Sequence, residues 1–356
     1  MIYYVLSALF PLLMWLISDN QSKFHQLDEE KKQRLTNRLT IIAIIPIFLL
    51  FVLRYNYIGA DTVGYVSFFK SEIRNYSFKE LFDQDSMHLE IGYRIYVKII
   101  SLFTNNYTVY FLVNGLVIFG TLLHFAKKYT NNPFVFFFLF ITLGTYQFVE
   151  TGLRQSLAMM ICLWSVDFVK NKKPIRFILL VILAYYFHKS ALIFLIVYPL
   201  SKIKRYNWMI TVYTIMTAFF IVDFSNYQEL FNELLGYEYT VEETDNGGIF
   251  MLLILILFAF SFFMTYDQRN RKKTEKVIFH LSLLTVMFWI LRLISRTAER
   301  ISFYFIFGIY IFFSKAVDCH KDELADFLKY LLIFVCLALF IYRNMNVRYQ
   351  FFWQGI

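Results

Sequence analysis

Charged residues are scarce in this chain. Asp, Glu, Lys and Arg make up 17% of its 356 residues, whereas hydrophobic residues make up 58% and aromatic residues 21%. The mean hydropathy is +0.52. This balance lies outside the range of water-soluble globular domains and inside that of integral membrane proteins. The net charge of +9 does not indicate a nucleic-acid partner, because membrane proteins concentrate Lys and Arg in their cytoplasmic loops.

Cysteine, glycine and proline are also few, at 3, 12 and 5 residues. The cysteines form no CxxC pair, so the sequence predicts neither a disulfide framework nor a cysteine metal site. No nucleophile elbow, HExxH helix, P-loop or dinucleotide fingerprint is present, and we expect neither a metal nor a cofactor. The shortage of glycine and proline, without an internal repeat, argues against a transporter built from broken helices in two related halves.

Long apolar runs occupy most of the chain. A membrane-spanning helix needs about 20 mostly apolar residues. The candidate segments are 2–18, 39–54, 108–126, 132–149, 154–170, 175–187, 190–201, 207–223, 248–266, 277–292, 300–315 and 327–342. The segments 175–187 and 190–201 are short enough to form a hairpin. The sequence therefore predicts an all-α polytopic membrane protein with about 10 to 12 transmembrane helices, forming a single integral membrane domain over residues 1–356. The first run lacks a basic n-region and a cleavage site, so we interpret it as a retained span.

The distribution of basic residues predicts the orientation. If the N-terminus lies outside, 21 of the 35 Lys and Arg residues fall in cytoplasmic segments, as the positive-inside rule requires. The segment 224–247, which holds no basic residue, is then an acidic extracytoplasmic loop. The one long loop, 55–107, also lies outside. In it, 61–73 and 90–103 have the pattern of interfacial amphipathic helices, and Asp61 is placed to act as an N-cap.

Arginine predominates among the basic residues expected on the outer side, and arginine suits a planar, bidentate grip on phosphate or carboxylate. The set is Arg54, Arg74, Arg94, Arg154, Arg292, Arg296 and Arg300. Arg292, Arg296 and Arg300 are spaced so that they would share one face of a continuous helix and repel one another. The negative charge of Glu299, of a ligand pyrophosphate or of anionic lipid headgroups would offset this repulsion. Arg54 could serve only to anchor the end of the second span.

Each acidic residue near the outer face has two interpretations. Glu150 and Arg154 are four positions apart, which suits a salt bridge on a helix, but Arg154 could instead bind a substrate phosphate. Asp61 is either a helix cap or a functional carboxylate. Glu90 is either solvated or paired with Arg94, or it is functional. As functional groups, Asp61 and Glu90 would act as a general base or orient a sugar hydroxyl.

A histidine interrupts the apolar sequence at "AYYFHKSAL" (184–192). Polar groups within membrane segments are energetically costly to insert, so they usually form pairs or take part in function. His188 could be a satisfied polar residue that closes the hairpin. Alternatively, it could carry a proton or donate a hydrogen bond to a phosphate or a sugar.

Five stretches, taken in order, carry a resemblance. They are "RYNYIGADTVGY" (54–65), "EIGY" (90–93), "GLRQSLA" (152–158), "AYYFHKSAL" (184–192) and "RISFYF" (300–305). Together they resemble the EpsG family of bacterial exopolysaccharide polymerases, a branch of the Wzy-type polymerases. The resemblance runs from about residue 1 to 315, and the last span and the tail "RNMNVRYQFFWQGI" add nothing to it.

The resemblance implies a GT-C-like, metal-independent glycosyltransferase in the bacterial cytoplasmic membrane, with its active site outside. Its substrates would be oligosaccharide repeat units on undecaprenyl pyrophosphate, and a flippase and a chain-length regulator are possible partners. The product would be capsule, O-antigen or biofilm matrix. In this interpretation His188, Asp61 and Glu90 are catalytic candidates. The substrate-binding set is Arg154, Arg292, Arg296, Arg300, Arg54, Glu150, Tyr65 and Tyr304.

Three alternatives stay open. A related GT-C transferase or ligase would have the same architecture but would move one sugar or one finished glycan. A membrane O-acyltransferase also uses an intramembrane histidine, but adds mass without lengthening the glycan. A transporter of lipid-linked sugars would make no covalent bond, and the outward clustering of arginine argues against a pathway through the membrane.

Overall fold

The computed structural model describes residues 1–20, 28–82, 89–130, 132–223, 226–227, 247–265, 273–319 and 322–354. Within these residues the backbone is helical, apart from turns and one isolated antiparallel β-bridge between Arg54 and Phe351. The all-α class expected from the sequence is confirmed. Most of the acidic loop 224–247 lies outside the described residues.

Every apolar segment expected from the sequence coincides with a helix or with consecutive helices. Among the described residues, four helices are long and apolar enough to cross a membrane, or up to six if each of two bent helix pairs crosses once. The four are Glu30–Leu53, Tyr107–Tyr129, Gly247–Met264 and Glu323–Asn344. Five shorter apolar helices have 10–17 residues. By length and composition this is a multi-pass membrane protein, and the larger number of spans expected from the sequence stays a prediction.

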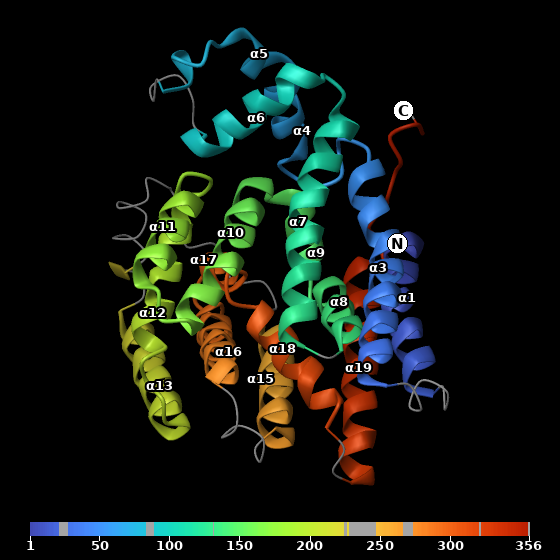
Figure 1. The fold of residues 1–356 in the computed structure, drawn as a ribbon, viewed down its shortest axis with the longest axis vertical. Helices are drawn as coiled ribbons and strands as arrows, with labels where there is room; N and C mark the ends of the chain where they lie inside the picture. The colour runs from blue at the N-terminus through green and yellow to red at the C-terminus, as the bar shows by residue number, and fades with distance from the viewer. Residues whose placement is uncertain are drawn as a thin grey trace. The chain divides into compact units, whose positions relative to one another are not determined.

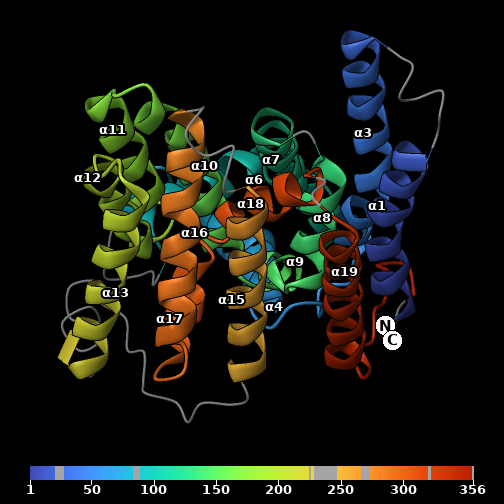
Figure 2. The ribbon, with the colours of Figure 1, turned by 90° about the horizontal axis from the view of Figure 1, so that it is seen from below.

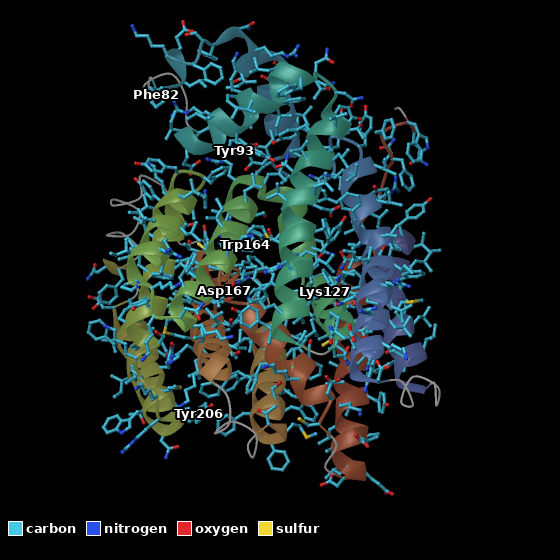
Figure 3. All side chains as sticks on the ribbon, in the orientation of Figure 1. Phe82, Tyr93, Lys127, Trp164, Asp167 and Tyr206 are labelled. Carbon is cyan, nitrogen blue, oxygen red and sulfur yellow. The ribbon has the colours of Figure 1, made fainter. Side chains whose placement is uncertain are left out.

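The chain forms two compact units. Unit 1 contains Met1–Ile161, Tyr186–His188 and Ile333–Ile356, and unit 2 contains Cys162–Tyr185 and Lys189–Leu332. The elements of unit 1 are α1 (Ile2–Asn20), α3 (Glu29–Leu53), α4 (Thr62–Ser67), the π-helical turn η1 (Phe68–Glu72), α5 (Ile73–Asn75), the 3₁₀ turn η2 (Glu80–Phe82), α6 (Ile91–Phe103), α7 (Tyr107–Tyr129), α8 (Pro133–Thr142), α9 (Thr145–Thr151), the start of α10 (Leu153–Lys170) and the end of α19 (Glu323–Asn344). Figure 1 shows that α4, α5 and α6 gather near the start of α7, and in Figure 3 Lys127 marks the other end of that helix.

The helices of unit 1 pack closely in pairs. Helix α1 packs against α3 and α8, and α3 also packs against α7. Helix α8 begins where the Asn132 side chain accepts a hydrogen bond from the backbone N–H of Val135, with Pro133 in the first turn. The chain bends by 63° between α8 and α9, where Gly144 has a φ of +84°. That left-handed conformation strains residues with a Cβ.

Unit 2 contains the remaining helices. They are the rest of α10, α11 (Pro174–Tyr185), the 3₁₀ helix η3 (Lys189–Ile196), α12 (Val197–Leu200), α13 (Tyr206–Val222), α15 (Gly247–Met264), α16 (Lys273–Leu291), α17 (Arg296–Ser302), α18 (Phe307–Val317) and the start of α19 (Glu323–Asn344). Helix α16 packs against α13, α15, α17 and α18. In Figure 2, α13, α16 and α15 lie side by side. The pair α17–α18 is bent by 61°.

The two segments of the long loop that were expected to be helical are helical, and their position at the membrane interface stays a prediction. The segment 61–73 forms α4, η1 and the start of α5, and 90–103 forms α6. Their apolar faces are buried within unit 1, with Phe69 stacked on Tyr110 at a centroid distance of 4.7 Å. The hydroxyl of Tyr93, labelled in Figure 3, lies 2.5 Å from that of Tyr110. The loop is thus a packed part of unit 1.

Candidate functional site

Basic residues tie the helices of the long loop together. Lys98 on α6 donates to the backbone carbonyls of Ile73 and Arg74, at 3.1 and 3.3 Å. Arg74 donates to the carbonyl of Ser101 at 2.8 Å, and Arg94 donates to a carbonyl of η2 at 2.7 Å. Carbonyls at the ends of helical segments need such partners. Arg74 and Arg94 therefore have a structural role in the described loop.

Glu90 joins two distant parts of the sequence. It precedes α6 at the N-cap position but makes no capping hydrogen bond with its side chain. Its Oε1 lies 3.1 Å from Nδ1 of His188, and its Oε2 accepts a hydrogen bond from Nη1 of Arg154 at 2.5 Å. The side chains of Glu90 and His188 are only 5% and 7% exposed. Three of the expected site residues therefore meet in unit 1.

Arg154 stands in the first turn of α10. Its side chain is 19% exposed, and its Nε donates to the hydroxyl of Tyr65 at 3.4 Å. Burial raises the pKa of Tyr65, while the adjacent Arg154 charge lowers it. Tyr65, also an expected site residue, thus lies beside the guanidinium that contacts Glu90.

Of the two interpretations of Glu150 and Arg154, the salt bridge between them does not form in the structure. Helix α9 ends at Thr151, Gly152 caps it, and α10 begins at Leu153. The spacing of four residues brings side chains together only on one continuous helix. Because the helix is interrupted between them, Arg154 contacts Glu90 while Glu150 contacts Tyr4.

The turn that carries His188 connects two short helices. Helix α11 packs against η3, which forms the hairpin suggested by the short apolar segments. The backbone N–H of Gly92 donates to the carbonyl of Tyr186 at 2.8 Å. A Cβ on Gly92 would lie 2.7 Å from that carbonyl oxygen, so only glycine permits this approach. The "EIGY" stretch thus holds the histidine turn through its backbone as well as through Glu90.

Asp61 immediately precedes α4 and is exposed. Asp61 occupies the N-cap position of α4, as expected, but its side chain makes no capping hydrogen bond. The reason is its backbone, which is already helical with φ −89° and ψ −3°, whereas capping residues typically have an extended backbone. Asp61 lies one helical turn from Tyr65, whose backbone N–H donates to the Asp61 carbonyl at 3.1 Å.

A second polar cluster in unit 1 surrounds Arg54, which is 0% exposed. Its guanidinium carbon lies 4.2 Å from the Phe51 ring centroid and 4.3 Å from that of Phe111. Its three guanidinium nitrogens have no hydrogen-bond partner within the described residues. The buried carboxylate of Glu150 interacts electrostatically with Arg54. Glu150 in turn accepts a hydrogen bond from Tyr4 at 3.1 Å.

The two clusters are connected through the "YIGADT" stretch. The hydroxyl of Thr62 donates to the backbone carbonyl of Glu150 at 3.0 Å. Gly59 has a φ of +95°, and a Cβ there would lie 2.6 Å from the same carbonyl oxygen. The loop that leads to Tyr65 is therefore fixed against the end of α9 at a position that requires glycine.

The C-terminal tail covers the start of this loop. Tyr55 donates its backbone N–H to Gln350 at 2.8 Å, and Phe352 donates to Leu53 at 2.9 Å. The hydroxyl of Tyr349 donates to the carbonyl of Leu50 at 2.7 Å. The tail is not one of the five stretches that carry the resemblance, but it is part of unit 1 and lies beside Arg54.

The three arginines near residue 300 belong to unit 2 and do not share one helix face, so that expectation was wrong. Helix α16 ends at Leu291 and α17 begins at Arg296, so a turn separates Arg292 from the other two. Arg292 donates to Glu299 at 2.6 Å and its side chain is 5% exposed. Arg296 and Arg300 are exposed and lie four positions apart on α17.

Tyr304, expected to bind substrate, is 1% exposed. Its hydroxyl lies 3.0 Å from that of Ser190, and both residues belong to unit 2. Because Ser190 is two residues beyond His188, this contact fixes the start of the helix that follows the histidine turn.

The comparison with protein families settles where this chain belongs. A model described as the EpsG family matches residues 37–354. The chain belongs to the EpsG family. The match confirms the resemblance drawn from the five sequence stretches, and membership implies a role in exopolysaccharide biosynthesis. It also extends through the last span and the tail, so the view that these add nothing to the resemblance was wrong. No curated protein and no solved structure matches the chain.

Some important residues of this EpsG-family chain were not selected from the sequence. They are the glycines that permit close approach, Gly59 and Gly92, and the buried partners Tyr4, Thr62 and Tyr349. The glycines had a usable signal: in a chain with 12 Gly among 356 residues, a glycine inside a polar motif is informative. No sequence signal singles out Tyr4 or Tyr349, because 26 tyrosines are spread along the chain. Among the described residues, no three His, Cys, Asp or Glu side chains are grouped to hold a metal ion.

Proposed function

We propose that this EpsG-family protein is a polymerase that joins oligosaccharide repeat units, carried on undecaprenyl pyrophosphate, into exopolysaccharide at the outer side of the bacterial cytoplasmic membrane. One observation carries the proposal: the buried Glu90 carboxylate contacts both the His188 imidazole and the Arg154 guanidinium. Glycosyl transfer from a pyrophosphate requires a base for the attacking hydroxyl and a cation for the leaving group.

In this proposal His188 is the general base and Glu90 positions it. A carboxylate that accepts the Nδ1 proton fixes the tautomer and makes Nε2 the basic nitrogen, as in hydrolase triads. Glu90 contacts two partners through its two oxygens, which makes it a poor candidate for the base itself. Asp61, exposed and one turn from Tyr65, would instead contact sugar hydroxyls.

In this proposal Arg154 binds the pyrophosphate of the lipid carrier. Its side chain is 19% exposed, compared with 5% for Glu90 and 7% for His188, so it is the most accessible of the three. Arginine binds phosphate oxygens in a planar, bidentate geometry. Arg296 and Arg300 on α17 are further candidates for phosphate contacts, whereas the buried Arg54, Glu150, Arg292 and Tyr304 would support the fold around the site.

The proposed reaction balances without a further reactant. The hydroxyl oxygen of the acceptor's distal sugar attacks the anomeric carbon of the donor chain, and its proton passes to Nε2 of His188. The bond between the anomeric carbon and the pyrophosphate oxygen breaks, and the electron pair leaves with the lipid pyrophosphate. The transition state resembles an oxocarbenium ion, and Arg154 stabilises the charge that develops on the leaving oxygen. His188 then releases its proton to water.

The proposal includes the wider expectations from the sequence. These are the GT-C-like architecture, the outward orientation of the 55–107 loop, and cooperation with a flippase and a chain-length regulator. The Glu90–Arg154–His188 cluster favours an enzyme over a transporter, because it gathers acid–base and cationic groups in one buried place.

The test uses purified protein in lipid nanodiscs with the lipid-linked repeat unit made by its own gene neighbourhood. Products are separated on a gel for the wild type, His188→Ala and the control Glu72→Gln, an exposed acid of the same loop. We expect a ladder from the wild type and the control and none from His188→Ala. A ladder from His188→Ala would remove His188 from the chemistry. A single discrete gel shift made by the wild type would indicate a transferase or ligase. Added mass without a longer glycan would indicate an O-acyltransferase. Movement of lipid across the membrane without a new product would indicate a transporter.

A further inference from the structure

An apolar groove of about 580 Å³ lies in unit 2 between α13, α15 and α16. Its size is within the roughly 300–1,000 Å³ typical of ligand pockets. Aliphatic and aromatic side chains form its walls, among them Ile221, Phe258, Phe262 and Met287. The three helices that form it lie side by side in Figure 2. None of the residues assigned to the proposed reaction lines this groove.

The groove is elongated along one helix. It is lined from Ile210 to Ile221 on α13, which corresponds to about 16 Å at 1.5 Å per helical residue. Helix α15 contributes the small residue Ala259, and α13 contributes Ala218. Both alanines are exposed, so they leave room between the larger side chains. A groove with this shape suits one extended hydrocarbon chain.

One end of the groove is next to a basic segment of the same unit. Ile290, in the last turn of α16, lines the groove, and Arg292 follows directly after the helix ends. The segment from Arg292 to Arg300 carries three arginines against one glutamate. Such a segment favours an anionic headgroup, while the groove favours a hydrocarbon chain.

We propose that this groove binds the polyprenyl chain of the lipid-linked substrate, with its phosphate groups beside the exposed Arg296 and Arg300. The inference rests on the proposed function, which supplies a lipid with one long isoprenoid chain and an anionic head. A bilayer phospholipid brings two acyl chains for each headgroup. The groove beside a basic segment therefore suits a one-chain anionic lipid better than a two-chain phospholipid.

The test measures lipid binding directly, without the reaction. Purified protein receives undecaprenyl phosphate in competition with phosphatidylglycerol, and the bound lipid is quantified by native mass spectrometry. The double variant Ala218→Phe/Ala259→Phe fills the groove from two walls. Its matched control, Ile215→Phe/Ile256→Phe, adds the same ring on the same two helices at exposed positions outside the groove.

We expect the wild type and the control to prefer undecaprenyl phosphate, and the groove-filling variant to lose about tenfold or more in that binding. Arg296→Gln/Arg300→Gln should lower the binding as well. Equal binding by the groove-filling variant and the wild type would overturn the proposal, as would a preference for phosphatidylglycerol.

The product ladder separates this proposal from the proposed function. If the wild type makes a ladder and the groove-filling variant binds undecaprenyl phosphate normally, the groove assignment fails and the polymerase stands. If the wild type makes no ladder but the groove-filling variant loses undecaprenyl phosphate, the groove stands and the polymerase fails. Thermal unfolding of all variants in detergent verifies that the added rings leave the fold intact.

Discussion

The Glu90 carboxylate lies 3.1 Å from the His188 imidazole, although 98 positions separate the two residues in the sequence. The same carboxylate accepts a hydrogen bond from Arg154. A buried carboxylate that contacts both an imidazole and a guanidinium holds the two groups in place. This relationship is therefore where substitutions should have the clearest effect on activity.

Replacing Glu90 with glutamine should abolish most of the polymerisation. Glutamine keeps the shape but removes the charge that would support His188 as it takes up a proton, so we expect a loss of about a hundredfold or more in rate. The measurement is the initial rate of ladder formation in nanodiscs, with protein amounts matched. Glu72→Gln is the control. Retention of the wild-type rate in Glu90→Gln would exclude the positioning role proposed for Glu90.

Replacing Gly92 with alanine should displace the turn that carries His188. The new Cβ would meet the Tyr186 carbonyl oxygen at 2.7 Å, and overpacking of this kind costs about 1–3 kcal/mol. We expect a lower Tm and a strongly reduced rate. The matched control is Gly64→Ala on α4, where no atom lies within 4 Å of the added Cβ. A Gly92→Ala protein that behaves like Gly64→Ala would contradict the close approach.

The buried charges of Arg54 and Glu150 should depend on each other. Arg54→Met removes the buried positive charge that acts on the buried Glu150 carboxylate, so we expect a lower Tm. Adding Glu150→Gln should recover much of that loss. Thermal unfolding of the two single variants and the double variant measures this coupling. Strictly additive losses would show that the two charges do not interact.

Tyr349 should anchor the C-terminal tail. Tyr349→Phe removes the hydrogen bond to the Leu50 carbonyl, which should lower the stability by about 1 kcal/mol. Tyr342→Phe is the control, because Tyr342 is 75% exposed. Deleting the chain after Asn344 should have a larger effect, since it also removes the backbone hydrogen bonds to Leu53 and Tyr55. Full activity and an unchanged Tm after the deletion would show that the tail is dispensable.

Tyr304 and Ser190 should be coupled within unit 2. Tyr304→Phe and Ser190→Ala each remove the same hydrogen bond, so each should cost about 1 kcal/mol and the double variant less than the sum. The measurement is a double-mutant cycle on thermal unfolding. If the cycle shows no coupling, the Ser190–Tyr304 hydrogen bond does not stabilise the helix that follows His188. Because Tyr304 is buried, we expect the Michaelis constant for the lipid-linked repeat unit to change little in Tyr304→Phe.

The sequence by itself determined the helical class, the membrane character and the family. These follow from apolar runs of helical length and from five short sequence stretches that, taken together and in order, resemble the family. The same reasoning selected Glu90, Arg154 and His188, because polar groups among apolar residues are costly and need a purpose.

Only the tertiary structure decided which of these residues meet. Spacing suited a Glu150–Arg154 pair and a shared helix face for Arg292, Arg296 and Arg300, and both interpretations required an unbroken helix. The helix ends before Gly152 in the first case and at Leu291 in the second. Helix interruptions and long-range contacts depend on the packing of segments distant in sequence. The pairing of Glu90 with His188 and the packing of the tail on the Arg54 loop are set by that packing, so no local pattern specifies them.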